Sequence, residues 1–275
     1  MRFLLITRPE LGDTNDLFRA ACQDRGVELT ELTAGNVGSA ELGGTGPRLI
    51  YCAGADPASR LIEKLVARPG DALLHDPYFP CDHQPILLRK SGIPMARAVY
   101  VPNLDTLAQQ AEWLGGFPIA VKLPGMEGGA GVSRAHSLED LSRQLAEPGG
   151  DSAMLEAFVP HVRCWRLTVL NGEVLAASAS VAPEGDFRTN IAGGRNDPDA
   201  SKPAGAADIA INAVRVLRLG FGGVDIMEGA DEKLTLAEVN FPCYFADQQT
   251  ESGTDIAGAI VDHLREKAAS GEVRA

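Results

Sequence analysis

Short apolar runs separated by amphipathic stretches make up the first eighty residues. The apolar runs predict strands at 2–7, 27–32 and 49–52, and stretches with helical spacing predict helices at 13–25 and 56–67. The second helix begins at Asp56-Pro57, a pair typical of a cap followed by a first turn. Strands that alternate with helices indicate a small parallel α/β lobe. The broken stretch from His75 to Cys81 reads as a linker.

Between residues 84 and 145, stretches with the helical spacing of apolar residues alternate with short apolar runs typical of strands. This pattern predicts helices at 84–91, 104–114 and 138–145, and strands at 95–101, 117–122 and 132–135. Gly92 and Pro94 close the first of these helices. The strand that ends at Lys122 and the strand that starts at Val132 stand on either side of a glycine-rich loop.

Beyond Gly150 the period becomes that of strands. Runs at 153–159, 164–170 and 173–181 predict an antiparallel meander, with Asn171-Gly172 as a hairpin turn. In the second run Trp165 alternates with Arg166, so the two side chains lie on opposite faces. We expect Trp165 in the core and Arg166 pointing away from it.

The last third of the chain predicts a helix at 206–219, strands at 221–227 and 234–240, and a helix at 255–267 with Thr254 as its cap. On this last helix Ile256, Ile260 and Leu264 form one apolar stripe. We expect the stripe to face a core.

The two strands of this region carry polar side chains of the kind that bind metal ions. If they form a hairpin that turns about residues 230 and 231, Asp225 lies opposite Leu236 and shares a face with Glu238 and Asn240. A shift of one residue in the turn would separate the three. Carboxylates between apolar neighbours are costly to bury unless paired or metal-bound, which favours a metal site over ordinary polar groups at a hairpin end.

The composition narrows the class of protein. The chain has 275 residues, 45% hydrophobic and 23% charged, which fits a soluble globular protein of one large domain or two to three lobes. A formal net charge of −12 argues against a general nucleic-acid binder. No apolar run suits a signal-peptide core or a membrane span, so a cytoplasmic location without membrane contact is expected.

The cysteines and histidines suggest no metal or redox centre. The five cysteines are scattered and lack Cys-x-x-Cys spacing, so we expect buried, reduced thiols rather than disulfides or a zinc site. The five histidines share no metal-ligand spacing and are expected to be structural or surface residues.

The candidate chemistry centres on the loop after Lys122, which has four glycines at 125, 128, 129 and 131. Glycines let a backbone approach an anion closely, and the ammonium adds a compact positive charge, which favours a phosphate-binding loop. The alternative is a surface turn between two strands. Two other phosphate motifs are absent, namely Gly-x-x-x-x-Gly-Lys-Ser/Thr and the full dinucleotide-binding glycine pattern.

Six motifs occur in a fixed order along the chain: Phe-Pro-Ile-Ala-Val-Lys122, the glycine loop, Leu155-Glu156-Ala-Phe158, Glu184-Gly-Asp-Phe-Arg188-Thr-Asn190, Val224-Asp225-Ile and Glu238-Val-Asn240. This order resembles that of the ATP-grasp superfamily, and most of all its RimK-type, glutathione-synthetase-like carboxylate–amine ligases. Ser252-Gly-Thr-Asp-Ile-Ala257 also resembles the entry to their last helix. The resemblance covers residues 81–267.

The resemblance implies an ATP-grasp fold of α/β and α+β class, in which a small Rossmann-like lobe accompanies two α+β lobes that enclose the nucleotide. The N-terminal lobe would span residues 1–80 and the ATP-grasp domain residues 81–275. Within that domain, 81–153 would form a central lobe with the glycine loop, and 154–275 a C-terminal lobe with the metal site.

The resemblance also implies roles for individual residues. ATP would contact Lys122 through its phosphates, with further nucleotide contacts from Gly128, Gly129, Gly131, Glu156, Phe158 and Asn190. The three glycines would act as a lid, and Glu156 and Phe158 would line the adenine and ribose pocket. Asp225, Glu238 and Asn240 offer the hard oxygens that Mg²⁺ prefers, with Mn²⁺ as an alternative ion. Arg166 and Arg188 would be catalytic and neutralise the moving phosphoryl group, although a loop arginine such as Arg188 is often merely solvated.

The implied activity is ATP-dependent formation of an amide or peptide bond through an acyl phosphate. It needs positioned cations and an enclosed site rather than a protein nucleophile. The partners would be a small-molecule carboxylate and an amine, such as an amino acid or small peptide. A ligase that modifies a protein tail, an inactive ATP-binding regulatory module and a phosphotransferase stay open as alternatives, and so does a homo-oligomer.

The chain departs from the family pattern at three places. Asp82 is followed by His83 where a lysine is usual, and the nearest lysine is Lys90. The loop carries Met126-Glu127 where a small hydroxyl residue is common. The segment that begins Phe241-Pro-Cys-Tyr replaces the usual Ser-Pro-Gly, so we expect this segment, up to Thr250, and the N-terminal lobe to determine the substrate.

Overall fold

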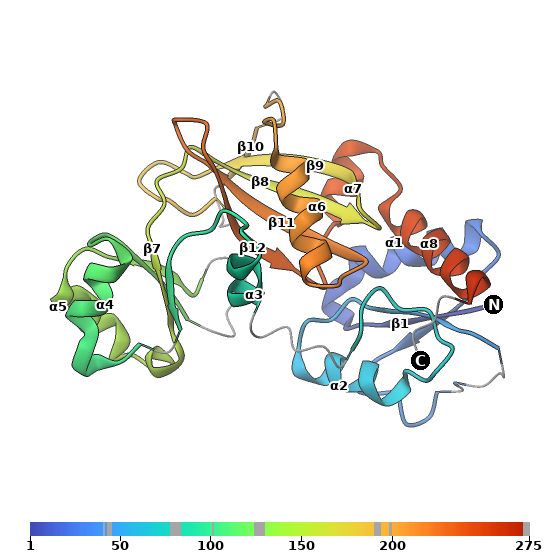
Figure 1. Cartoon of the computed structure of the whole chain (residues 1–275). Coiled ribbons are helices and arrows are strands. Elements are labelled where there is room, and N and C mark those ends of the chain that lie inside the picture. The colour runs from blue at the N-terminus through green and yellow to red at the C-terminus, as the bar shows by residue number, and fades with distance from the viewer. Residues whose placement is uncertain are drawn as a thin grey trace.

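Three lobes, each built on its own sheet, make up the protein (Figure 1). The structure is a computed structural model and describes residues 1–40, 42, 46–77, 84–100, 102–123, 130–189, 194–197 and 200–271. Among these residues, no helix is both long and apolar enough to span a bilayer.

The N-terminal lobe is a parallel α/β unit, as its alternating pattern predicts. Its strands are β1 (Arg2–Ile6), β2 (Glu28–Leu32) and β3 (Leu49–Cys52), in the order β2-β1-β3 and all parallel. A short 3₁₀ turn (Pro9–Leu11) leads into α1 (Gly12–Asp24), and α2 (Pro57–Val66) follows β3. Asp56 caps α2, since its side chain accepts a hydrogen bond from the Ser59 backbone N–H at 3.0 Å. The predicted cap is confirmed.

The first antiparallel sheet contains β4 (Ala98–Tyr100), β5 (Ile119–Lys122), β6 (Val132–Ala135) and β7 (Met154–Ala157), in the order β4-β7-β5-β6. Two helices, α4 (Leu107–Leu114) and α5 (Leu138–Leu145), and 3₁₀ turns at Leu104–Thr106 and Gly150–Ser152 complete this lobe. Its core forms one cluster around Leu114, Ile119 and Leu141.

The second antiparallel sheet has five strands: β8 (Arg163–Leu170), β9 (Glu173–Val181), β10 (Arg195–Asn196), β11 (Phe221–Glu228) and β12 (Leu234–Asn240). Their order is β10-β9-β8-β11-β12. Helices α3 (Gln84–Lys90) and α6 (Ala206–Val216) pack with it, and Trp165, Leu88 and Val214 share its core. The predicted Asn171-Gly172 turn is confirmed, and both residues have the positive φ that such a two-residue turn requires.

The meander predicted for 153–181 is wrong in its first strand. β7 pairs with β4 and β5 in the first sheet, and only β8 and β9 form a hairpin in the second. The stretch 158–162 passes from one sheet to the other. A strand pattern fixes which residues are extended, but it does not fix the partner strand, because both sheets offer similar apolar faces.

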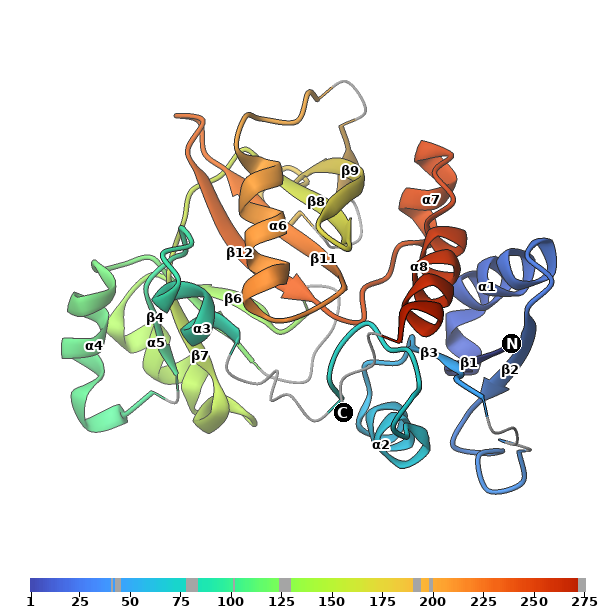
Figure 2. The ribbon, with the colours of Figure 1, turned by 45° about the vertical axis from the view of Figure 1, so that its right-hand side comes forward.

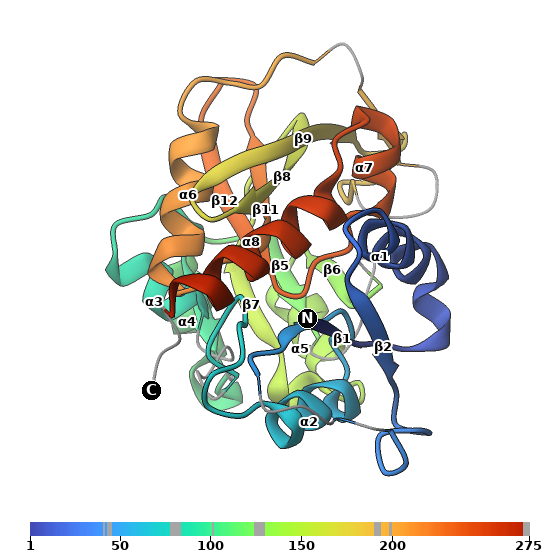
Figure 3. The ribbon, with the colours of Figure 1, turned by 90° about the vertical axis from the view of Figure 1, so that its right-hand side faces the viewer.

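The C-terminal helices α7 (Ala246–Ser252) and α8 (Ile256–Ser270) return to the N-terminal lobe, and α8 lies beside α1 (Figures 2 and 3). Ile256, Ile260 and Leu264 are fully buried in a cluster with Phe3 and Phe18, so the predicted stripe does face a core. The cap of α8 is not Thr254 but Asp255, whose carboxylate accepts from the Gly258 N–H at 2.9 Å. The last helix of the chain thus packs on the first lobe, and the two share one hydrophobic core.

Candidate functional site

A cavity of about 180 Å³ lies between the two antiparallel sheets. One wall comes from β5, β6 and β7, and the other from β8, β9, β11 and β12 with the loop at 187–189. Seven of the residues singled out in the sequence line it: Lys122, Glu156, Phe158, Arg166, Arg188, Asp225 and Glu238. The sheets thus bring together positions that are more than a hundred residues apart.

The remaining predicted residues lie elsewhere or outside the described residues. Asn240 does not line the cavity but hydrogen-bonds to two residues that do. Gly131 lies at the base of the glycine loop, where its carbonyl accepts from the Leu123 N–H at 2.8 Å. Gly128, Gly129 and Asn190 lie outside the described residues, as do Asp82, His83 and Glu127. Lys90 is exposed at the end of α3 and is not among the cavity residues.

Lys122 and Glu156 form an ion pair on the first wall. Ala120 on β5 lies opposite Glu156 on β7, and Lys122 follows two residues later on the same face. Lys122 Nζ is 2.6 Å from Glu156 Oε2, with the carboxylate side chain 8% exposed and the lysine 24% exposed. The ammonium is therefore held at the strand end that leads into the glycine loop.

Aromatic rings and an arginine build the neighbouring wall. Phe158 and Phe187 meet edge to face with centroids 5.5 Å apart, and the Arg134 guanidinium carbon lies 5.1 and 5.0 Å from the two ring centroids. Such stacking fixes the ring planes and leaves an apolar surface toward the cavity. Phe187 was not singled out in the sequence, although it stands inside the 184–190 motif.

Arg188 links the two walls of the cavity. Its guanidinium pairs with Asp186 at 2.7 Å, and its Nη1 donates to the Val132 carbonyl of β6 at 3.4 Å. The Arg188 side chain, together with the backbone N–H groups of Phe187 and Arg188, holds the pKa of Asp186 well below its usual range. The loop is thus ordered by one ionised carboxylate.

The three predicted metal residues come together on the second wall. Asn240 Nδ2 lies 3.1 Å from Asp225 Oδ2 and 3.1 Å from Glu238 Oε1. Arg166, directly opposite Asp225 on β8, engages both oxygens of that carboxylate, with Nη2 at 2.8 Å from Oδ2. In the described part of the chain, no three Asp, Glu, His or Cys side chains gather as a metal site, so this set depends on the asparagine.

Burial raises the pKa of Asp225 to about 6, even though Arg166 favours the ionised form. Desolvation by the cavity wall also acts on Glu238, although part of its side chain is exposed. There the hydrogen bonds with Asn240 and Asp225 and the charges of Lys122 and Arg166 together outweigh desolvation and lower the pKa. Glu238 raises the pKa of Asp225, and a dication bound between the two carboxylates would favour the ionised form of both.

The predicted register of this hairpin is wrong, and a β-bulge explains why the three residues still meet. Glu228 pairs with Leu234 and Ile226 with Leu236, so the turn is centred on residue 231 and each residue pairs one position later than predicted. Without correction Asp225 would face Ala237. The bulge beside Ile226 inserts one extra residue, and Asp225 lies opposite Glu238 instead of Leu236.

Several cavity residues were missed by sequence reasoning, among them His161, Cys164, Ser180 and Met227. Cys164 and Met227 could have been found from strand alternation, since each lies two residues from Arg166 or Asp225 on the same face. His161, expected to be structural or at the surface, lines the cavity and contacts the Val159 carbonyl at 2.9 Å. Burial raises the pKa of the Cys164 thiol to about 12, which leaves it a poor nucleophile.

The cysteines outside the cavity fit the expectation of reduced thiols. Cys22, Cys52 and Cys243 are free and buried, and Cys164 is free and partly exposed, while Cys81 lies outside the described residues.

The arrangement of a parallel lobe and two antiparallel sheets is that of ATP-grasp proteins. The ATP-grasp ligase PsnB, solved with a variant of its minimal precursor, Mg and ADP, superimposes with a TM-score of 0.71 at 17% identity, over 97% of this chain and 98% of that one. This likeness confirms the predicted fold class. The sequence profile of the RimK-like ATP-grasp domain matches residues 83–264. The chain belongs to the RimK-like ATP-grasp family, and the resemblance of its motifs is confirmed.

Curated relatives agree with this assignment. A probable alpha-L-glutamate ligase of Xanthomonas oryzae pv. oryzae is 33% identical over 205 residues, which are 72% of this chain and 68% of the relative. A probable alpha-L-glutamate ligase of Methanococcoides burtonii is 26% identical over 195 residues, which are 68% of this chain. The matched region spans 64% of the length of that relative.

Proposed function

We propose that this protein is an ATP- and Mg²⁺-dependent carboxylate–amine ligase with L-glutamate as one of its substrates. The observation that carries the proposal is the cavity in which Lys122 and Arg166 face the carboxylates of Asp225 and Glu238. Lys122 on the first wall, and Arg166 beside the hard oxygen ligands on the second wall, suit a nucleoside triphosphate with its metal ion. The names of the curated relatives support glutamate.

The donor set fits a magnesium ion. Asp225 and Glu238 supply carboxylate oxygens, and the Asn240 amide lies between them, so that a half-turn about its last bond would present its oxygen at the same point. When bound there, the ion would neutralise phosphate charge. In this structure the Arg166 guanidinium donates hydrogen bonds to both oxygens of the Asp225 carboxylate. We infer that the Arg166 side chain turns toward the phosphates when the ion binds to Asp225.

The residues of this chain would act mainly by position and charge. In the proposed reaction the terminal phosphoryl group of ATP moves to the substrate carboxylate and ADP leaves; the amine then attacks the carbonyl carbon, and phosphate departs as the amide forms. Lys122, Arg166 and Arg188 would offset the charge on the phosphoryl oxygens. No protein nucleophile is needed, which agrees with the high thiol pKa of Cys164.

The nucleotide base would lie against Phe158, beside Glu156, while Gly128, Gly129 and Gly131 of the loop after Lys122 would cover the phosphates and Asn190 would add a polar contact. The hydrogen bond from the Leu123 N–H to the Gly131 carbonyl joins the two strands where they flank this loop.

A direct assay supplies ATP, Mg²⁺ and a panel of amino acids paired with glutamate, and measures ADP and phosphate. Release of both products that depends on an acid and an amine together supports the ligase. Release of AMP with pyrophosphate, or no turnover with any pair, contradicts it. ADP release that needs no amine would indicate a phosphotransferase.

The acid or amine partner of glutamate could belong to another protein. PsnB, the structural neighbour, was solved with a peptide precursor, which favours testing this variant. Incubation of a proteome with the protein, ATP and glutamate should then give protein mass increases of one or more glutamate residues. The absence of such shifts, together with turnover on free amino acids, would leave the small-molecule reaction.

A nucleotide-binding module without catalysis is the second candidate. The observation that favours it is the missing upstream lysine of the Asp82-His83 pair, which the exposed Lys90 does not replace in the cavity. It predicts ATP binding by calorimetry without any product, for every pair of acid and amine.

A further inference from the structure

The N-terminal lobe has a polar edge that the proposed nucleotide site does not use. In open parallel sheets, ligands bind beyond the carboxyl ends of the strands. Arg8 follows β1 and Asp56 follows β3. Ala72 forms a parallel bridge with Leu49 of β3, and His75 follows three residues later. Arg8 Nε lies 3.5 Å from Asp56 Oδ2, so the first two already meet at this edge.

Buried polar atoms without a hydrogen-bond partner concentrate at the same edge. Among the described residues they include Arg8 Nε, Thr14 Oγ1, Tyr51 Oη, Arg60 Nη1 and Glu63 Oε2, all in the N-terminal lobe. Thr14 and Tyr51 are 3% and 1% exposed. Three of these atoms are in ion pairs without hydrogen-bond geometry, since Arg8 Nε lies 3.5 Å from Asp56 and Arg60 Nη1 lies 3.0 Å from Glu63 Oε2. Buried polar groups are normally hydrogen-bonded, so this edge has bonding capacity that a polar ligand or water can complete.

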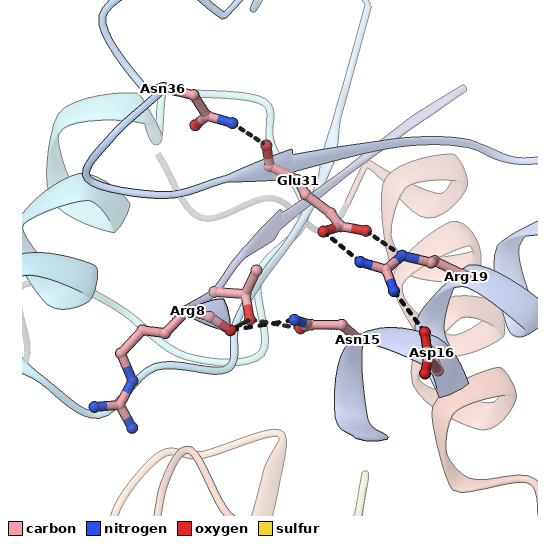
Figure 4. Close-up of polar contacts among 7 residues, drawn as sticks. Arg8, Asn15, Asp16, Arg19, Glu31 and Asn36 are labelled. Carbon is pink, nitrogen blue, oxygen red and sulfur yellow. Dashed lines mark hydrogen bonds and ion pairs between the residues drawn. The ribbon is translucent and has the colours of Figure 1, made fainter. Parts of the chain in front are cut away.

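Figure 4 shows how the start of this edge is held. The Asn15 side chain donates to the Arg8 carbonyl at 3.2 Å, and the Thr7 hydroxyl contacts Asn15 Oδ1 at 2.5 Å. The Arg8 guanidinium points away from Asn15 in this view. The backbone of the edge is thus fixed, and the Arg8 guanidinium is directed toward Asp56.

Arg60 is the second cation of this edge. Helical side chains extend toward the N-terminus of their helix, which carries the Arg60 guanidinium from α2 toward the carboxyl ends of the strands. Its Nη1 is 3.0 Å from Glu63 Oε2, without hydrogen-bond geometry, and its Nη2 is 3.1 Å from His75 Nε2. The Arg60 side chain is 22% exposed whereas that of Glu63 is 2% exposed, so a ligand reaches the arginine and not the glutamate.

The same arginine contacts Phe241, the residue that follows the proposed metal ligand Asn240. Its guanidinium carbon lies 5.5 Å from the ring centroid of Phe241. The His75 ring packs on Phe241 as well, with centroids 4.3 Å apart. Phe241 thus connects the end of β12, which carries Asn240, to Arg60.

We propose that Arg60 binds a carboxylate of the amine substrate, which is an amino acid with a free carboxylate such as L-glutamate. The proposal rests on the ligase function proposed above. A guanidinium matches a planar carboxylate with two parallel N–H groups. Arg60 Nη1 is buried against Glu63, so Nε and Nη2 would make these bonds from a side chain that Phe241 and His75 already orient. The acid substrate would instead place its reacting carboxylate near Arg166 and the phosphates, on the other side of Phe241.

The test compares full-length variants in a kinetic assay with L-glutamate as the amine substrate. Arg60→Gln alone leaves Glu63 buried without its cation, which endangers folding. The double variant Arg60→Gln with Glu63→Gln removes both charges and keeps the side-chain sizes. Glu63→Gln alone is the matched control that retains the arginine, and Arg19→Gln is a control on the far side of α1, where Arg19 pairs with Glu31.

For the double variant we expect a KM for glutamate at least tenfold higher, with kcat within threefold, the KM for ATP within twofold and an unchanged melting-temperature shift on adding ATP with Mg²⁺. The two controls should keep the glutamate KM within threefold. Glutamine and isoglutamine, which lack the side-chain and the α-carboxylate respectively, tell which group Arg60 binds. The wild type should discriminate against one of these amides, and the double variant should lose that discrimination.

Calorimetry with L-glutamate and a non-hydrolysable ATP analogue separates this proposal from the ligase function. Glutamate binding that weakens in the double variant, without turnover in the wild type, would overturn the ligase and keep the carboxylate site. Turnover with an unchanged glutamate KM in the double variant would overturn the carboxylate site and keep the ligase. Absence of glutamate binding to the wild type would also overturn the carboxylate site.

Discussion

Two arginine–aspartate pairs in this protein have the same chemistry and opposite surroundings. Arg48 and Asp71 in the N-terminal lobe are 4% and 1% exposed, and Arg48 also donates to the carbonyls of Val66 and Leu42. Arg166 and Asp225 in the cavity wall are 30% and 10% exposed. The first pair is closed off with its donors directed to the backbone, whereas the second faces a cavity and shares its carboxylate with Asn240.

The difference teaches how to separate a structural ion pair from one that a ligand can displace. Breaking a fully buried pair leaves a charge that water cannot reach, so its loss should appear in stability. A pair at a cavity wall can exchange its partner for a metal ion or a phosphate, so its loss should appear in activity. The following variants test that division, from the largest expected effect to the smallest.

Glu238→Gln should have the largest effect on activity. It keeps the size of the side chain but removes the charge that would hold a dication, so we expect turnover to fall by at least about 100-fold. Glu238 is exposed, and the melting temperature without nucleotide should stay unchanged. The stabilisation by ATP with Mg²⁺ should disappear, as it should in the wild type after chelation of Mg²⁺. A variant that keeps the full ATP-dependent shift would place the metal site elsewhere.

Arg48→Met should have the largest effect on stability. It leaves the buried Asp71 carboxylate with only Arg68, whose Nε is 3.6 Å away, and we expect the free energy of unfolding to fall by about 3 kcal/mol in a denaturant titration. Turnover per folded molecule should equal that of the wild type. The double variant Arg48→Met with Asp71→Asn serves as the control and should recover part of the stability. Equal stability of the single variant and the wild type would contradict the structural role.

Arg166→Met should reverse that pattern. Removal of a cation that would face the phosphoryl group should lower turnover by roughly 100-fold. Asp225 then loses its partner at a site that opens to the cavity, so the loss in melting temperature should be smaller than for Arg48→Met. If Arg166→Met lost more stability than Arg48→Met and kept its turnover, the Arg166–Asp225 pair would be structural, which contradicts this prediction.

Arg19→Gln should have the smallest effect. Arg19 lies on the surface of α1, paired with Glu31 and Asp16 (Figure 4). Solvent screens such a pair, and we expect the melting temperature to change by about 2 °C or less, with full turnover. A change as large as that of Arg48→Met would show that exposure does not decide the contribution of these pairs.

Much of the fold could be predicted from local patterns, because periodicity reports which face of an element is buried. The Asn171-Gly172 turn, the buried face of Trp165 and the stripe of Ile256 on the last helix all follow from spacing. Strand partners could not be predicted in this way. β7 reads like a neighbour of β8, yet it completes the other sheet.

The candidate site shows the same limit at the level of one residue. The motifs identified Asp225 and Glu238, but the spacing placed Asp225 opposite Leu236. Two deviations add here: the turn shifts the pairing by one residue and the bulge by another, and a total shift of two residues leaves Asp225 and Glu238 on the same face. Leu236 and Val239 both face one core although they are three residues apart. In a regular strand, residues on one face are an even number apart, so this spacing of two apolar residues is the trace that the bulge leaves in the sequence. The contacts of Arg60 with Glu63, His75 and Phe241 leave no such trace in the sequence. These residues come from α2, from the segment before residue 76 and from the position just after β12, so no short motif contains them.

The packing of α8 on the N-terminal lobe sets an order for biosynthesis. Phe3 and Phe18 leave the ribosome among the first residues, but their core includes Ile256, Ile260 and Leu264, which emerge more than two hundred residues later. Contacts of such large sequence separation form late, and the first lobe therefore stays incomplete until nearly the whole chain has been made. Truncation before residue 256 should leave a nascent chain whose N-terminal lobe remains open to proteases.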